Sequence, residues 1–222
     1  MAKSINRVAI IGTGVVGASW TALFLAKGLE VVATDVAPDA DASLRHFVEA
    51  AWPALKRLGL APDASQSNLK FTADLPTAVK NANFVQENGP ERIEFKKSLY
   101  RQLDDLLPAD VIIASSSSGL TMSEIQSGCP SHPERCVIGH PFNPPHLVPL
   151  VEIVGGAKTS EETIQRAFEF YTSIGKRAVR LRLARNSGAH FNARIAQGAH
   201  LGGIVRQKAN AVNAELAQDR NR

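Results

Sequence analysis

Three glycines with the spacing Gly12-x-Gly14-x-x-Gly17 directly follow a short apolar run at residues 8–11. In this context the first glycine permits a tight turn, the second lets a diphosphate approach the backbone, and the third lets a helix pack closely on the strand. Asp35 ends the next apolar run, where a carboxylate accepts hydrogen bonds from ribose hydroxyls and repels a 2′-phosphate. The pattern therefore predicts a site for NAD rather than NADP, and a glycine-rich loop without a ligand is the alternative.

Three more motifs with polar side chains follow in a fixed order. They are a serine run with a glycine at residues 115–119, the segment Gly139-His140-Pro141-Phe142-Asn143-Pro144, and Val151-Glu152. Together with the glycine turn, this order and spacing resemble the 3-hydroxyacyl-CoA dehydrogenase superfamily, and the resemblance extends from residue 7 to residue 182. Residues 51–60, 118–120 and 148–152 look most like its branch of carnitine dehydrogenase and λ-crystallin, a gulonate dehydrogenase.

For the alcohol chemistry, the resemblance implies roles for His140, Glu152 and Ser118. His140 resembles the general base that takes the proton of the substrate hydroxyl, Glu152 the carboxylate that orients the imidazole, and Ser118 the hydroxyl that binds the substrate oxygen. Such a set suits hydride transfer, because hydride leaves a carbinol carbon only as its hydroxyl loses a proton to a base of near-neutral pKa. A histidine after a strand and a serine run can also have structural roles alone.

For the cofactor, the resemblance implies three further contacts. Asn143 resembles a residue that lines the nicotinamide and substrate site, and Glu91 and Lys96 resemble family positions that contact the cofactor. Glu91 and Lys96 have simpler alternatives as well. Glu91 stands where a helix is expected to begin, a position that favours acids, and Lys96 can be a solvated side chain.

Short apolar runs alternate with amphipathic helical patterns along the chain. Runs typical of strands lie at residues 8–11, 31–34, 69–71, 84–87, 111–114, 136–140 and 151–154, with an alternating edge strand at 178–182. Helical patterns lie at residues 18–27, 38–58, 75–80, 91–107 and 159–174, and a capping box predicts another short helix after Thr121. Pro53 is expected to bend or break the second helix. The alternation predicts an α/β fold with a doubly wound, mostly parallel Rossmann sheet.

Composition argues against several other classes of protein. No run of 18 apolar residues suggests a membrane span, and the first residues lack the apolar core of a signal peptide, so a cytoplasmic location is expected. Residues 176–222 hold ten Lys+Arg and two Asp+Glu, so the basic excess belongs to the end of the chain, and no nucleic-acid partner is expected. Cys129 and Cys136 lack the spacing of a zinc site, which predicts reduced thiols and no metal.

The pattern changes after residue 183. Family members continue with K-E-x-x-G-x-x-x-N-R and an all-helical domain that dimerises and closes the substrate cleft, and residues 184–192 differ from that motif. We therefore expect an NAD-binding Rossmann domain at residues 1–183 and an atypical, partly disordered tail at residues 184–222, with the helical domain missing or garbled. A shifted reading frame in the gene is one hypothesis for this tail.

Together these observations predict an NAD-dependent dehydrogenase that oxidises a small-molecule substrate, at the 3-hydroxyl of a small hydroxy acid or of a 3-hydroxyacyl-CoA. Members that hold coenzyme A place Ser and Lys on the helix after the second strand, near the positions of Ala51 and Leu58 here. Without the helical domain the cleft has one wall, so we expect cofactor binding with weak or absent turnover. The resemblance implies a homodimer for complete members. A non-catalytic NAD-binding or structural protein is the alternative.

Overall fold

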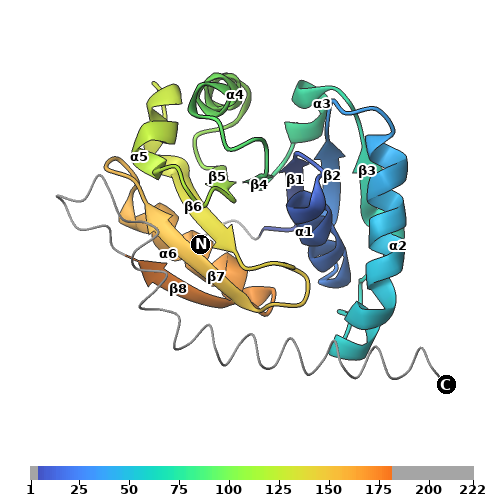
Figure 1. The fold of residues 1–222 in the computed structure, drawn as a ribbon. Helices are drawn as coiled ribbons and strands as arrows, with labels where there is room; N and C mark the ends of the chain where they lie inside the picture. Colours follow the sequence, from blue (N-terminus) through green and yellow to red (C-terminus); the bar gives the residue numbers. More distant parts are fainter. Residues whose placement is uncertain (1–4, 182–222) are drawn as a thin grey trace. The chain divides into compact units, whose positions relative to one another are not determined.

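An eight-stranded sheet with the order β3-β2-β1-β4-β5-β6-β7-β8 forms the centre of the computed structural model, which describes residues 5–181 (Figure 1). Its strands are β1 (Arg7–Ile11), β2 (Glu30–Thr34), β3 (Leu69–Phe71), β4 (Phe84–Glu87), β5 (Ile112–Ser115), β6 (Cys136–Pro141), β7 (Leu150–Gly155) and β8 (Arg177–Leu181). Strands β1 to β6 are parallel, β7 is antiparallel to β6, and β8 is parallel to β7. The predicted mostly parallel α/β sheet is confirmed. The predicted tail at residues 184–222 lies outside the described residues.

Helices cover both faces of this sheet. They are α1 (Val15–Ala26), α2 (Ala40–Leu58), α3 (Leu75–Val79), α4 (Ile93–Leu106), α5 (Met122–Ile125) and α6 (Glu161–Ser173), with short 3₁₀ helices η1 (Gln66–Asn68), η2 (Gln126–Gly128) and η3 (Pro133–Arg135). One core cluster joins Trp20 and Phe24 of α1, Leu44 of α2, and Phe170 and Tyr171 of α6. Helices α3, α4 and α5 lie on the other face (Figure 1). The two layers explain why the central strands β4 and β5 are buried along their whole length.

Two helices differ from the sequence-based expectation. Helix α1 begins at Val15 rather than at residue 18, directly after the last residue of the turn. Helix α2 continues through Pro53, so the break that this proline could cause does not occur. Pro53 lies on the exposed side of α2, while Leu44 and Leu55 on the opposite side are buried in the core. Burial of the opposite side stabilises α2 enough to offset the backbone hydrogen bond that Pro53 cannot donate.

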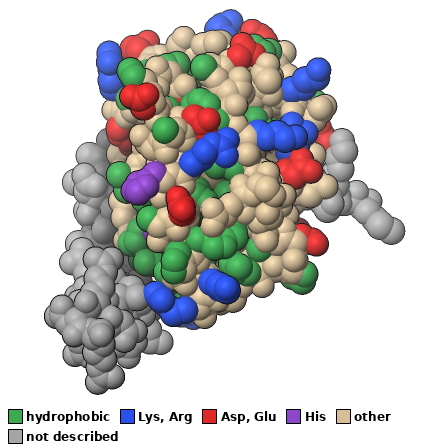
Figure 2. Space-filling view, turned by 90° about the vertical axis from the view of Figure 1, so that its right-hand side faces the viewer, with side chains coloured by type: hydrophobic (Ala, Val, Ile, Leu, Met, Phe, Trp, Pro, Cys, Tyr) green, Lys and Arg blue, Asp and Glu red, His purple; other side chains and the backbone are tan. Residues whose placement is uncertain are grey.

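The outer surface on the side of α2 carries a mixture of charges. Figure 2 shows this side, with acidic and basic side chains interspersed and a group of hydrophobic side chains gathered in its lower half. Within residues 5–181, no helix has the length and apolar character that a membrane span requires.

Candidate active site

The predicted site residues meet at one edge of the sheet. After β3 on one side of β1, the chain crosses to β4 on the other side, so the point between β1 and β4 is the topological switch point at which ligands of such folds bind. Gly12 follows β1, the serine run follows β5, and His140 lies near the end of β6. Because β7 runs in the opposite direction, Glu152 near its start lies at the same edge.

Each of the three positions of the turn has its own relation to a glycine residue. Gly12 has a φ of 83°, which side chains rarely tolerate, and its N–H donates to the Thr34 carbonyl at 2.9 Å. A Cβ on Gly17 would lie 1.9 Å from the Gly12 carbonyl oxygen, so only glycine lets α1 approach the turn. A Cβ on Gly14 would meet nothing within 4 Å. The first and third glycines are therefore needed for the fold, and the second leaves open space above the turn.

That open space lies at the N-terminus of α1. Gly14 is the N-cap residue, no side chain caps the helix there, and no acidic residue lies in its first turn. The helix is otherwise buried from Gly17 to Ala26, so its orientation against the sheet is fixed. The first N–H groups of a helix and its dipole attract anions, which makes this end suited to a diphosphate. The geometry fits the cofactor that the sequence predicts.

Asp35 is held against the same turn. Its Oδ2 accepts hydrogen bonds from the Thr13 N–H at 2.6 Å and from the Thr13 hydroxyl at 3.0 Å, and its Oδ1 accepts from the Ala37 N–H at 2.9 Å. Partial burial by itself would raise the pKa of Asp35, but these hydrogen bonds outweigh it and lower the pKa below its usual value. The side chain is therefore an ionised acceptor beside the turn, as a ribose contact requires.

His140 and Glu152 face each other across β6 and β7. They are register partners in the antiparallel pair, and His140 Nδ1 lies 3.2 Å from Glu152 Oε2. Their side chains are 15% and 13% exposed, so the pair is largely shielded but reachable from the sheet edge. In the tautomer that carries its proton on Nδ1, facing the carboxylate, Nε2 is the basic nitrogen of the ring. The structure thus brings together the two side chains on which the predicted chemistry depends.

The serine turn after β5 is shaped by Glu91. Its Oε1 accepts hydrogen bonds from the N–H groups of Ser118 at 3.0 Å, Gly119 at 2.7 Å and Leu120 at 3.2 Å, and from the Ser117 hydroxyl at 2.5 Å. Burial alone would raise the pKa of Glu91, but these donors and the nearby Lys96 charge lower it. Glu91 therefore stays ionised and fixes the backbone that presents the exposed Ser118.

Lys96 occupies a different position from a solvated lysine. It is 1% exposed, and its Nζ lies 2.8 Å from both carboxylate oxygens of Glu87, which is fully buried at the end of β4. Glu87 also accepts hydrogen bonds from the Ser115 hydroxyl and the Gly89 N–H, both at 2.6 Å. The alternative of a solvated side chain is wrong for Lys96. Sequence reasoning missed Glu87, although an acid at the end of a buried strand is a usable signal.

A second buried network, also missed, lies beneath the switch point. The Tyr171 hydroxyl donates to Gln86 Oε1 at 2.6 Å, and Gln86 Nε2 donates to Ser116 Oγ at 2.9 Å. Ser116 Oγ in turn accepts from the Trp20 indole at 3.1 Å and donates to Asn88 Oδ1 at 2.7 Å. The network connects α6, β4, the serine turn and α1, and so fixes the parts of the site relative to one another.

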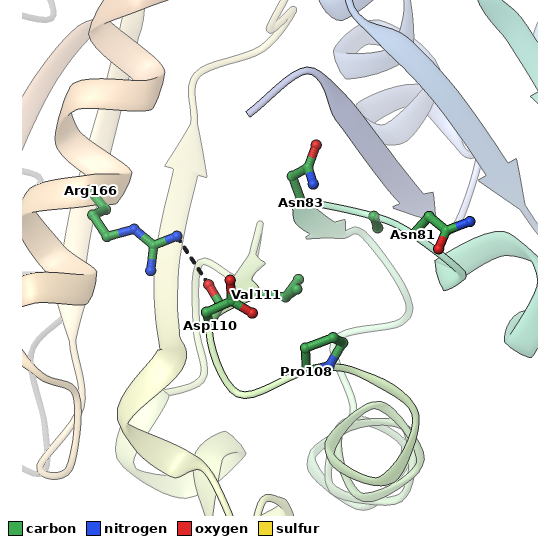
Figure 3. A pocket seen from close by; sticks show the side chains of 7 residues that line it. Asn81, Asn83, Pro108, Asp110, Val111 and Arg166 are labelled. Carbon is green, nitrogen blue, oxygen red and sulfur yellow. Dashed lines mark hydrogen bonds between the residues drawn. The ribbon is translucent and has the colours of Figure 1, made fainter. Parts of the chain in front are cut away.

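Asn143 and the pocket near Arg166 lie outside the buried hydrogen-bond networks of the site. Asn143 is exposed in the loop that connects β6 to β7. A pocket of about 230 Å³ lies at the opposite edge of the sheet, before β4 and β5, and there Arg166 donates to the Asp110 carbonyl at 3.0 Å (Figure 3). That pocket is remote from the glycine turn and from His140. In the described part of the chain, no group of three His, Cys, Asp or Glu side chains could hold a metal ion.

Comparisons with known proteins identify relatives of this chain. The chain is 51% identical over 178 residues to L-carnitine dehydrogenase of Pseudomonas putida, which covers 80% of this chain and 55% of that protein. It is 49% identical over 177 residues to L-carnitine dehydrogenase of Streptomyces griseus, covering 80% of this chain and 52% of that protein. The chain therefore spans about half the length of these two relatives.

Solved structures of related dehydrogenases also match the chain. The crystal structure of 5-formyl-3-hydroxy-2-methylpyridine 4-carboxylic acid 5-dehydrogenase, an NAD⁺-dependent dismutase, matches with a TM-score of 0.79 and 35% identity, covering 94% of this chain and 67% of that one. The structure of 3-hydroxybutyryl-CoA dehydrogenase from Escherichia coli K12 matches with a TM-score of 0.75 and 27% identity, covering 81% and 39%. The family model for the 3-hydroxyacyl-CoA dehydrogenase NAD binding domain matches residues 7–184, and the chain belongs to that family.

Proposed function

We propose that this chain is the NAD-binding part of a dehydrogenase that oxidises the 3-hydroxyl of a small hydroxy acid or of a 3-hydroxyacyl-CoA. The observation that carries the proposal is the His140–Glu152 pair, 3.2 Å apart, at the sheet edge that also holds the glycine turn. An alcohol dehydrogenase needs a proton acceptor beside a bound nicotinamide, and this edge supplies the acceptor and the diphosphate site together.

In this proposal each residue has a specific task. NAD, when bound, supplies the hydride acceptor. His140 accepts the hydroxyl proton of the substrate, and Glu152 orients the imidazole and stabilises its charged form. The Ser118 hydroxyl holds the substrate oxygen, on a turn that Glu91 keeps in shape.

The remaining site residues act on the cofactor. Gly12, Gly14 and Gly17 seat the diphosphate, and Asp35 binds the adenosine ribose. Asn143 lines the nicotinamide side. Lys96 acts at the cofactor site indirectly, since its ammonium is engaged by Glu87 and orders the backbone after β4.

The names of the relatives favour L-carnitine as the first substrate to test. The chain matches about half of those proteins, so we expect it to bind NADH and to turn over substrate weakly or not at all. We propose a cytoplasmic location and, for a longer form with a helical domain, a homodimer.

The test measures binding and turnover side by side. NADH fluorescence titration of the chain is expected to saturate, while NAD reduction is assayed with L-carnitine, gulonate and 3-hydroxybutyryl-CoA. The same screen on a longer form would identify the substrate. His140→Ala serves as the control, because it should leave NADH binding unchanged and remove any turnover. A chain that binds no NADH would contradict the proposal, and robust turnover would contradict the expected need for a second domain.

A second prediction concerns the choice between NADH and NADPH. Asp35 is ionised, so it should repel the 2′-phosphate, and NADPH is expected to bind roughly 100-fold more weakly than NADH. The pKa of Asp35 is lowered, so the contribution of its carboxylate to this preference should be lost only as the pH falls through that lowered pKa. Asp35→Asn should weaken NADH binding and narrow the difference between the affinities for NADH and NADPH. Equal affinities in the unmodified chain would refute the assignment of Asp35.

A further inference from the structure

The loop of residues 142–149, which joins β6 to β7, has few means of holding its own shape. Three of its residues are prolines without an N–H, and its internal bonds are two turns, from the Leu147 and Val148 N–H groups to the Pro144 carbonyl at 3.0 and 2.9 Å. The loop nevertheless carries Asn143 and separates His140 from Glu152. Its shape must therefore be imposed by other elements.

Lys176 reaches this loop from beneath. It follows the glycine that ends α6, is 5% exposed, and its Nζ donates to the carbonyls of Pro145 and Val148, the latter at 2.8 Å. The Arg177 N–H donates to the Pro149 carbonyl at 2.7 Å. Three loop carbonyls are thus bound by two consecutive residues at the start of β8.

The same ammonium also contacts the helix of the glycine turn. Its Nζ lies 4.8 Å from the centre of the Trp20 ring, a cation–π distance, and the Trp20 indole donates to the serine turn through Ser116. One helical position earlier, Ser19 Oγ accepts the His146 N–H at 2.9 Å and lies 2.6 Å from His146 Nδ1. Lys176 therefore lies where the loop after His140, helix α1 and strand β8 converge.

We infer that Lys176 is a positioning residue, whose N–H groups fix the β6–β7 loop and thereby hold Asn143 and the His140–Glu152 pair in register with helix α1. The link to His140 is short. Phe142, the first loop residue, has its ring 5.4 Å from the His140 ring, and the last loop residue, Pro149, lies three positions before Glu152. The roles of His140 and Asn143 in this inference rest on the proposed function.

The two loop carbonyls require N–H donors from Lys176, not its charge. Among residues 5–181 no acidic side chain forms an ion pair with it, and the titratable groups near it are His146 and Lys27. Burial lowers the pKa of Lys176 to about 7, and burial together with the Lys176 charge lowers that of His146 to about 4. A neutral amine retains two N–H groups, enough for both carbonyls, so the contact persists on either side of that pKa.

The test separates N–H donors from side-chain volume. Lys176→Met keeps the volume without donors, and Lys176→Gln keeps two donors without charge. Lys27 and Lys176 both line a cavity of about 280 Å³ beside the loop, so Lys27→Met makes the same chemical change nearby. Amide hydrogen exchange over residues 142–149 and the ¹⁵N signals of the His140 ring are the readouts. Lys176→Met should raise loop exchange about tenfold or more and shift the His140 signals, since two hydrogen bonds are lost.

The controls make each outcome decisive. Lys27→Met should match the unmodified chain, and Lys176→Gln should restore most of the protection. A folded Lys176→Met variant with unchanged His140 signals and loop exchange would overturn the inference. If that variant does not fold, Lys176→Gln decides: a folded chain with a protected loop supports the role of the donors, and its failure to fold refutes it. NADH titration of the unmodified chain tests the proposed function separately, because the exchange and ring signals can be read without it.

Discussion

Gly17→Ala is expected to abolish useful NADH binding and to lower the free energy of unfolding by about 2–3 kcal/mol. The added Cβ would lie 1.9 Å from the Gly12 carbonyl oxygen and 3.3 Å from the Asn88 side chain. The first of these neighbours is backbone, so relief requires α1 to move away from the turn. A shift of about 1 Å would misplace the helix N–H groups and weaken NADH binding roughly 100-fold. Fluorescence titration and urea unfolding measure the two effects.

Gly14→Ala is the matched control for this variant. A Cβ at position 14 meets nothing within 4 Å, so the free energy of unfolding should change by less than about 1 kcal/mol. The methyl group would instead occupy the space above the turn, and NADH should bind more weakly to a fully stable chain. Equal loss of stability in both variants would contradict the open space beside Gly14, and unimpaired NADH binding in either would show that the turn is not the diphosphate site.

The turn could be predicted from sequence because its causes are local. Gly17 lies against Gly12 and Asp35 accepts hydrogen bonds from Thr13, both within one strand–helix–strand unit, and the spacing of these residues contains that geometry. The pairing of His140 with Glu152 could be expected only through resemblance, because the direction of β7 decides whether position 152 reaches the same edge. The pattern of apolar residues does not predict whether a strand runs parallel or antiparallel to its neighbour.

The buried polar contacts could not be predicted for a related reason. Gln86, Ser116 and Tyr171 are far apart in sequence, and their hydrogen bonds exist only once the sheet order is formed. The start of α1 was missed because Gly14 caps it without a side-chain signal. Pro53 does not break α2, because the burial of the opposite side of the helix outweighs the local penalty of a proline.

Lys96→Met is expected to have the larger effect on stability, a loss of about 3–5 kcal/mol in the free energy of unfolding. The substitution leaves the Glu87 carboxylate fully buried, with the Ser115 hydroxyl and the Gly89 N–H as remaining partners but no cation within 3 Å. A buried charge without its counter-ion is costly, whereas a neutral pair of similar volume is not. Chemical unfolding monitored by circular dichroism measures the loss.

A double-mutant cycle separates this structural role from a direct cofactor contact. Glu87→Gln combined with Lys96→Met removes both charges and keeps an acceptor for the Gly89 N–H, so at least half of the lost stability should return. Lys97→Met, at an exposed neighbour that pairs loosely with Glu94 at 3.8 Å, should change stability by less than about 0.5 kcal/mol. If the double variant is stable and binds NADH normally, Lys96 acts by ordering the backbone after β4. A stable double variant with lost NADH affinity would instead place the Lys96 ammonium on the cofactor.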